Sequence, residues 1–241
     1  MKRSTVLALF AVLFLATFAG AQCIAPCIFY AGDFDINNPN ANGLANENDA
    51  IVGGNPYGAA TYENFIIGGT TANVTGLYTN TLSMLSPASA YWEIRTGISE
   101  GNGGTLVASG TGSGANFSQT PTGRSGFGFN EYTDLVSGLN IDLPVGLYWM
   151  AVVPQDPNNA NRSFLSNTFQ HNQVGADIQN LQFFNSAFFG ANFTNANNQI
   201  GVAPAFSAGV VGMGSPEPST LITLGTGLFA VAGVVRRRLS R

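Results

Sequence analysis

The chain of 241 residues carries little charge: thirteen acidic and nine basic side chains leave a formal net charge of −4, and charged residues make up 9% of the sequence. An ordinary soluble domain contains about 25%. A hydrophobic content of 45% and an aromatic content of 11% exclude a disordered polyampholyte. The acidic balance excludes a surface built to bind the phosphates of nucleic acid.

The first 21 residues have the three parts of a secretory signal peptide. Lys2 and Arg3 precede an apolar run over residues 6–18, and Ala19 and Ala21 follow it. These two alanines are the small residues that signal peptidase requires at positions −3 and −1. The run is shorter than the ~18–20 residues of a spanning helix, which disfavours the alternative of an uncleaved anchor. We predict a signal helix that signal peptidase removes after export.

The opposite end combines a proline motif, an apolar segment and a cluster of arginines. Pro216, Glu217 and Pro218 are followed by an uncharged segment over residues 221–235 and then by Arg236, Arg237, Arg238 and Arg241. With the two hydroxyl residues before it, the segment spans about 25 Å as a helix, a marginal match to a hydrocarbon core of ~30 Å. Because arginines resist translocation, we expect a transmembrane helix with its last residues in the cytoplasm.

The order of these three parts resembles the PEP-CTERM sorting signal of exported proteins in Gram-negative bacteria. The resemblance implies that Pro216, Glu217 and Pro218 are recognised by exosortase, an integral membrane enzyme that processes the chain near this motif. It also implies an inner-membrane anchor before processing, then a place at the cell surface or in an extracellular matrix with exopolysaccharide. Two prolines keep such a segment extended, where an enzyme can reach it. An ordinary tail anchor with a proline-rich stop is the alternative.

The body between the two signals is acidic and has the pattern of an all-β domain. It holds twelve acidic residues and three arginines, a net charge of −9. Apolar residues recur at every second position in short runs separated by Gly, Asn and Pro, which indicates strands. The segment 147–153 is apolar on both faces and therefore predicts a central strand. The other expected strands are 62–67, 74–78, 89–95, 105–109, 132–136, 139–143, 163–168, 181–184 and 204–211.

These runs predict an antiparallel β-sandwich or jelly roll of about eight to ten strands over residues 53–212. An Asn- and Asp-rich segment, 22–52, precedes it, and the sorting signal, 213–241, follows. Residues 92–110, with 143–149 further on, resemble the β-sandwich bodies that PEP-CTERM proteins often carry. That resemblance implies a fold and no established activity.

The segment before the sandwich contains a candidate calcium site and the two cysteines of the chain. Asp33, Asp35 and Asn37 place oxygen side chains at alternate positions, and Ca²⁺ prefers six to eight oxygen ligands. An Asx-rich solvated linker explains the same residues. Cys23 and Cys27 are four residues apart, so in an oxidising compartment they form a small disulfide loop or pair between chains. Apart from Ca²⁺, we expect no cofactor.

The residues that acid–base catalysis would need are sparse. His171 is the only histidine, no nucleophile elbow accompanies it, and its polar surroundings indicate an exposed loop. Glu131 and Asp134, with Asp142 on the next expected strand, are the alternative of a glycosidase carboxylate pair. Scattered acids produce such pairs by chance, so we expect a protein that is not an enzyme.

A cluster of phenylalanines is the remaining candidate for binding. Five of them fall within eleven residues amid Asn and Gly: Phe183, Phe184, Phe188, Phe189 and Phe193. Burial in the core explains most of them, and any that are exposed would form a carbohydrate or partner patch. We therefore expect a non-enzymatic surface or matrix protein, with a carbohydrate-binding module, assisted by calcium or not, as the alternative.

Overall fold

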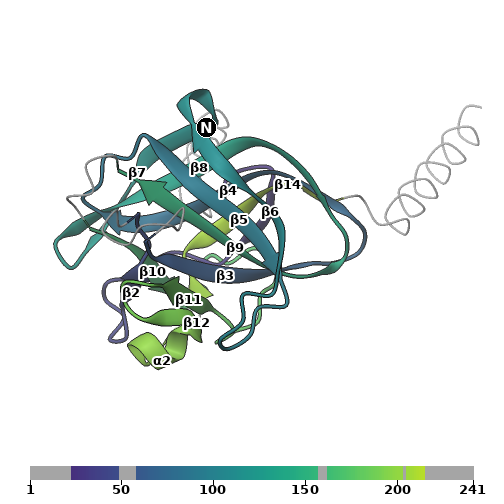
Figure 1. Cartoon of the computed structure of the whole chain (residues 1–241). Coiled ribbons are helices and arrows are strands. Elements are labelled where there is room, and N and C mark those ends of the chain that lie inside the picture. Colours follow the sequence, from purple (N-terminus) through teal and green to yellow (C-terminus); the bar gives the residue numbers. More distant parts are fainter. Residues whose placement is uncertain (1–22, 49–57, 157–161, 203–204, 215–241) are drawn as a thin grey trace, which may run out of the picture.

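Two antiparallel β-sheets make up the protein, as its computed structural model shows (Figure 1). The structure describes residues 23–48, 58–156, 162–202 and 205–214, and the structural observations below refer to these residues. The expected signal peptide with Ala19 and Ala21 lies outside them. So does the sorting segment with its Pro-Glu-Pro motif and its arginines.

The larger sheet is built around one long strand, β4 (Ala72–Ser83). Along one edge, β4 pairs with β8 (Phe129–Leu143), and β7 (Phe117–Gly126) pairs with β8 in turn. Along its other edge, the first part of β4 pairs with β14 (Ala208–Gly214) and the last part with β10 (Ser163–Thr168). Shorter strands extend this edge: β1 (Cys27–Tyr30), β2 (Gly43–Ala45) and β13 (Ala205–Phe206).

The smaller sheet has six strands in the order β12-β11-β3-β9-β5-β6. Their bounds are β12 (Ala191–Asn195), β11 (Phe183–Ser186), β3 (Ala60–Ile67), β9 (Gly146–Gln155), β5 (Ser89–Thr96) and β6 (Thr105–Ser113). The helical elements are short: the 3-10 turn η1 (Gly114–Asn116) links β6 to β7, and α2 (Ala196–Ile200) follows β12.

The main core lies between the two sheets. Trp92, Met150 and Val152 enter it from the smaller sheet, and Leu77 and Val210 enter it from the larger one. Successive side chains of a strand point to opposite faces, so residues of the other parity on β4, β8 and β10 point away from this core. The outer face of the larger sheet is therefore not needed for the main core and is available for a binding site.

The expected all-β fold is confirmed, with fourteen strands in the described residues instead of eight to ten. The strand over 147–153 is β9, which lies centrally between β3 and β5, as predicted. The two runs 132–136 and 139–143 form the single strand β8, because Gly138 adopts a φ of 74° and absorbs an irregularity without ending the strand. The run expected over 204–211 is divided between β13 and β14.

The Asn- and Asp-rich segment is part of the sandwich, because β1 and β2 pair within the larger sheet. Cys23 and Cys27, at the start of this segment, form a disulfide. In the described part of the chain, no helix has both the length and the apolar character needed to cross a membrane.

Candidate functional site

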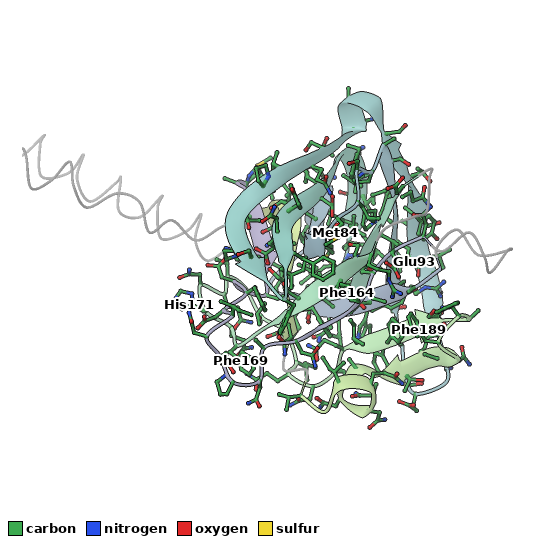
Figure 2. All side chains as sticks on the ribbon, turned by 90° about the vertical axis from the view of Figure 1, so that its left-hand side faces the viewer. Met84, Glu93, Phe164, Phe169, His171 and Phe189 are labelled. Atoms are coloured by element: carbon green, nitrogen blue, oxygen red, sulfur yellow. A yellow bond between two sulfur atoms is a disulfide. The ribbon has the colours of Figure 1, made fainter. Side chains whose placement is uncertain are left out.

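An apolar groove crosses the outer face of the larger sheet. One pocket of about 180 Å³ is lined by Asn42, Gly43, Leu82, Phe127, Phe129 and Phe164. A second pocket of about 220 Å³ shares Gly43 and Phe164 with it and continues to Leu44, Ala45, Arg162, Phe184, Phe189 and Gln199. We call the two pockets together the aromatic groove. Figure 2 looks onto this side of the molecule, where Phe164 lies between Met84 and Phe189.

Strand register places the rings of the groove. Phe164 of β10 is opposite Leu82 of β4, which is opposite Glu131 of β8. Phe129 lies two residues before Glu131 and therefore points to the same face of the sheet. Its ring meets that of Phe164 edge-on, with the ring centroids 5.5 Å apart. Three strands that are distant in the sequence thus form one apolar floor.

Arg162 spans the two phenylalanines at the other end of the groove. Its guanidinium carbon lies 5.4 Å from the ring centroid of Phe164 and 5.7 Å from that of Phe189. Its charge is balanced by Glu47, whose carboxylate lies 2.8 Å from the guanidinium. The groove therefore presents rings and a neutralised ion pair, and it presents no excess positive charge.

Phe127 stands at the open end of the groove in an unfavourable backbone conformation. It lies in the turn between β7 and β8 with a φ of 55°, and Gly128 follows with a φ of 85°. Two consecutive positive φ values define a turn in which Asn-Gly or Gly-Gly is preferred. A phenylalanine there is strained, and its side chain is 57% exposed. Such an outlier points to a function of the side chain.

A separate polar pocket has a volume of about 310 Å³. It is lined by Asp33, Phe34, Asp35, Asn38, Arg124, Phe169 and His171. His171 and Phe169 lie beside this region in Figure 2. The imidazole of His171 is 73% exposed, and its Nδ1 is 3.8 Å from Asp33. The expectation of an exposed loop histidine is therefore confirmed.

The candidate calcium ligands have other partners in this pocket. Asp33 accepts hydrogen bonds from the hydroxyl of Tyr30 at 2.6 Å and from the guanidinium of Arg124 at 2.7 Å. Asp35 accepts from the backbone and side-chain amides of Asn37, at 2.9 and 3.1 Å, which forms a local turn. Among the described residues, no three His, Cys, Asp or Glu side chains group as metal ligands would. Calcium binding by Asp33, Asp35 and Asn37 stays a prediction.

Of the three carboxylates considered for glycoside hydrolysis, Asp142 is exposed and the other two are not at an open surface. Glu131 is fully buried and accepts hydrogen bonds from Ser166, Thr122 and Arg124. Asp134 is also fully buried. Since the two side chains lie on opposite faces of β8, they do not form a pair that faces solvent.

Burial raises the pKa of three described carboxyl groups, and two of them, Asp134 and Glu63, are fully buried. It raises the pKa of Asp134 to about 7, against the opposing effect of hydrogen bonds from Thr81 and Gln119. It raises the pKa of Glu63 well above its ordinary value, although Gln182 and the backbone of Phe206 donate to that carboxyl group. Both groups belong to the interior of the protein.

The phenylalanine cluster divides as expected, with most members in the core. Phe183, Phe184 and Phe193 are buried, whereas Phe188 and Phe189 are 48% and 45% exposed. Phe189 contributes to the aromatic groove, which sequence reasoning did not find. The pair Phe127 and Phe129, separated by a turn glycine, was the available signal, because apolar residues are unusual in a tight turn.

Comparisons with known proteins place the chain by its sorting segment. Residues 216–238 match the family model of the PEP-CTERM protein-sorting motif. Neither curated proteins nor solved structures gave a match to this chain. The chain therefore carries the PEP-CTERM sorting motif joined to a β-rich body, which makes it an exported protein that exosortase sorts.

Proposed function

We propose that this protein acts without catalysis at the surface or in the extracellular matrix of a Gram-negative bacterium, where its aromatic groove binds exopolysaccharide. Before processing, the segment 221–235 holds the chain in the inner membrane and the β-rich body lies outside. Exosortase then processes the chain near Pro216, Glu217 and Pro218. The sorting motif at residues 216–238 supports this route, and the groove supports the binding.

The chemistry of the groove suits a sugar. Aromatic rings offer apolar faces on which pyranose rings stack, and phenylalanine does so without adding a charge. Asn42 and Gln199, which line the two pockets, carry amides that both donate and accept hydrogen bonds. Pocket volumes of about 180 and 220 Å³ together reach the lower end of the ~300–1,000 Å³ range of ligand sites.

The electrostatics favour a neutral glycan over an anionic one. The body carries only three arginines, and each of them is in an ion pair: Arg95 with Glu93, Arg124 with Glu131, and Arg162 with Glu47. An anionic polymer would meet a domain with a net charge of −9 and no excess of positive charge in the groove. We therefore propose neutral hexose units as the groove's ligand.

Phe127 is the observation that carries this proposal. A strained, exposed aromatic side chain in a turn is unfavourable for folding, and binding gives a reason for its presence. Retention of the purified protein on immobilised exopolysaccharide from the producing organism tests it. The double substitution F127A/F189A removes two exposed rings and is expected to abolish retention. The control V145A changes an exposed residue of the loop between β8 and β9, far along the sheet from the groove.

Retention that is equal in the two variants and in the wild type would refute glycan binding in the groove. The sorting route has its own test, intact mass spectrometry of the surface form. That mass is expected to show loss of residues 1–21 and processing near Pro216. A full-length mass with both ends intact would refute the route and leave the groove proposal standing.

A further inference from the structure

The last described strand ends at an apolar pocket that lies outside the aromatic groove. This pocket of about 420 Å³ is lined by three isoleucines, two alanines, three glycines and Cys27. We call it the exit pocket, because Gly214, the last residue of β14, is one of its lining residues. None of the described residues that line it has an ionisable side chain.

Five parts of the fold form the walls of the exit pocket: β1, the end of β3, the start of β4, residues 175–176 and the end of β14. The end of β3 contributes Ile66, which is 36% exposed and whose backbone amide donates to the carbonyl of Ala176 in the opposite wall, at 2.9 Å. The start of β1 is held beside β14 by a hydrogen bond from the amide of Gly212 to the carbonyl of Pro26, at 2.7 Å. The walls are therefore fixed by backbone hydrogen bonds, and the pocket is present before anything enters it.

The covalent chain brings the sorting motif to this pocket. Pro216 lies two residues beyond Gly214, so its Cα is at most about 7.6 Å from a residue that lines the pocket. Pro218 is at most about 15 Å from the same residue. Of the four pockets described above, the exit pocket is the one that Gly214 lines. The motif is thus confined to the surroundings of an uncharged, apolar cavity.

The composition of the motif fits that cavity. A residue before proline is restricted to extended conformations, which applies to Ser215 and to Glu217. In an extended chain, Pro216 and Pro218 point to one side and Glu217 points to the other. Proline rings are apolar and have no amide hydrogen that burial would leave without an acceptor. In this arrangement the carboxylate of Glu217 would stay in water, which avoids the cost of burying an unpaired charge.

We propose that Pro216 and Pro218 dock in the exit pocket, so that the folded body holds its own sorting motif and exosortase must draw the motif out. The occupant is a segment of this chain, residues 215–218. Because the exit pocket forms only when the body folds, docking of the motif means that the body has folded before exosortase processes the chain. The inference rests on the sorting motif and is independent of glycan binding in the aromatic groove.

Nuclear magnetic resonance on the full chain in detergent micelles, with labelled isoleucine methyl groups, tests the docking directly. Ile28, Ile66 and Ile67 are expected to show Overhauser effects to proline ring protons. The P216S/P218S variant, which leaves the folded body unchanged, is expected to shift these methyl resonances. Contacts to detergent chains alone, contacts that appear only at high protein concentration, or no contacts at all would each overturn the proposal.

A substitution that fills the exit pocket gives a second test of docking, this time from the rate of proteolysis. Gly68 lines the exit pocket, and a Cβ built there meets no atom within 4 Å, so the position accepts a side chain and we expect the ring of G68F to occupy the pocket. We expect a protease of broad specificity to cut residues 215–220 about tenfold faster in G68F, which corresponds to about 1.4 kcal/mol of docking energy. The control L106F enlarges an exposed residue of β6 and is expected to keep the wild-type rate. Equal rates in all three proteins would contradict docking.

Discussion

Arg162 lies over the ring of Phe164, a residue shared by the two pockets of the aromatic groove, with its guanidinium carbon 5.4 Å from the ring centroid. Its partner Glu47 is buried, whereas Arg162 itself is half exposed. Arg124 is in the opposite situation: its side chain is mostly covered, and it contacts two acids, Asp33 and Glu131. Arg124 therefore stabilises two acidic side chains from a mostly buried position, whereas Arg162 stabilises one from a half-exposed position.

Removing Arg124 is expected to be far more damaging than removing Arg162. R124M leaves the fully buried carboxylate of Glu131 without its ionic partner, which lies 2.6 Å away in the wild type. Such a loss lowers the free energy of unfolding by about 3–5 kcal/mol. R162M removes a half-exposed arginine from the buried Glu47, which keeps a hydrogen bond from the backbone amide of Ser163, so the expected loss is smaller, about 1 kcal/mol. Urea denaturation measures both losses, and the double variant R124M/E131Q is expected to recover part of the first. Similar losses in R124M and R162M would contradict this assignment.

Asp134 is expected to make the stability depend on pH. Its pKa is about 7 in the folded protein and 3.8 in its ordinary state. A raised pKa stabilises the fold fully below about pH 4, and this contribution disappears as the pH rises towards 7. Relative to D134N, the wild type should therefore lose stability between pH 4 and 7, by on the order of 4 kcal/mol at 1.36 kcal/mol per pKa unit.

Urea midpoints measured at intervals from pH 4 to 8 follow this difference. D142N, which removes one carboxylate at an exposed position of the same strand, serves as the matched control. A constant difference between the wild type and D134N over the whole range would show that Asp134 titrates normally.

Phe127 allows stability and binding to be separated. In F127N the left-handed backbone becomes favourable, which offsets the lost contact with Phe34, whose ring centroid is 6.2 Å away. The free energy of unfolding should stay within about 1 kcal/mol of the wild type. Retention on exopolysaccharide should fall, because the exposed ring is gone. A variant that binds as the wild type does would remove Phe127 from the site.

Reduction of the disulfide between Cys23 and Cys27 should weaken the fold moderately. The loop that it closes has a sequence separation of four, and loop-closure entropy for so short a loop amounts to about 2 kcal/mol. Denaturation with and without reductant measures the loss, and the double variant C23S/C27S should be insensitive to reductant. Complete unfolding on reduction would show that the disulfide holds β1 in the sheet, which the pairing with β14 is expected to do by itself.

The strands that could be predicted from the sequence are those that carry their own pattern. β5 alternates apolar and polar residues, and β9 is apolar on both faces, so both are visible in a short window. β1, β2 and β12 have three to five residues each. Their stability comes from pairing with strands that are distant in the sequence, and no local pattern contains that information. Gly138 misled the prediction of β8, because a glycine that bends a strand has the same appearance as one that ends it.

The sorting signals could be predicted because the residues of each signal are contiguous in the sequence. The aromatic groove could not be predicted, because it is assembled from residues that are distant in the sequence. Phe129 and Phe164 are 35 positions apart, and register alone brings their rings together. Glu131 and Asp134 show the reverse error, because two acids that are close in the sequence lie on opposite faces of one strand. Proximity along a strand therefore says little about proximity at a site.

The position of β14 in the larger sheet determines how the body resists a pulling force applied beyond Gly214. β14 lies between β1 and β4 and is hydrogen-bonded on both sides. Any tether attached beyond Gly214 pulls along the axis of this strand, and the interstrand hydrogen bonds lie across that axis. The load is then shared by both ladders in shear, so the bonds must break together and not one after another. A pull on the end of this strand is therefore opposed by two ladders of hydrogen bonds at once.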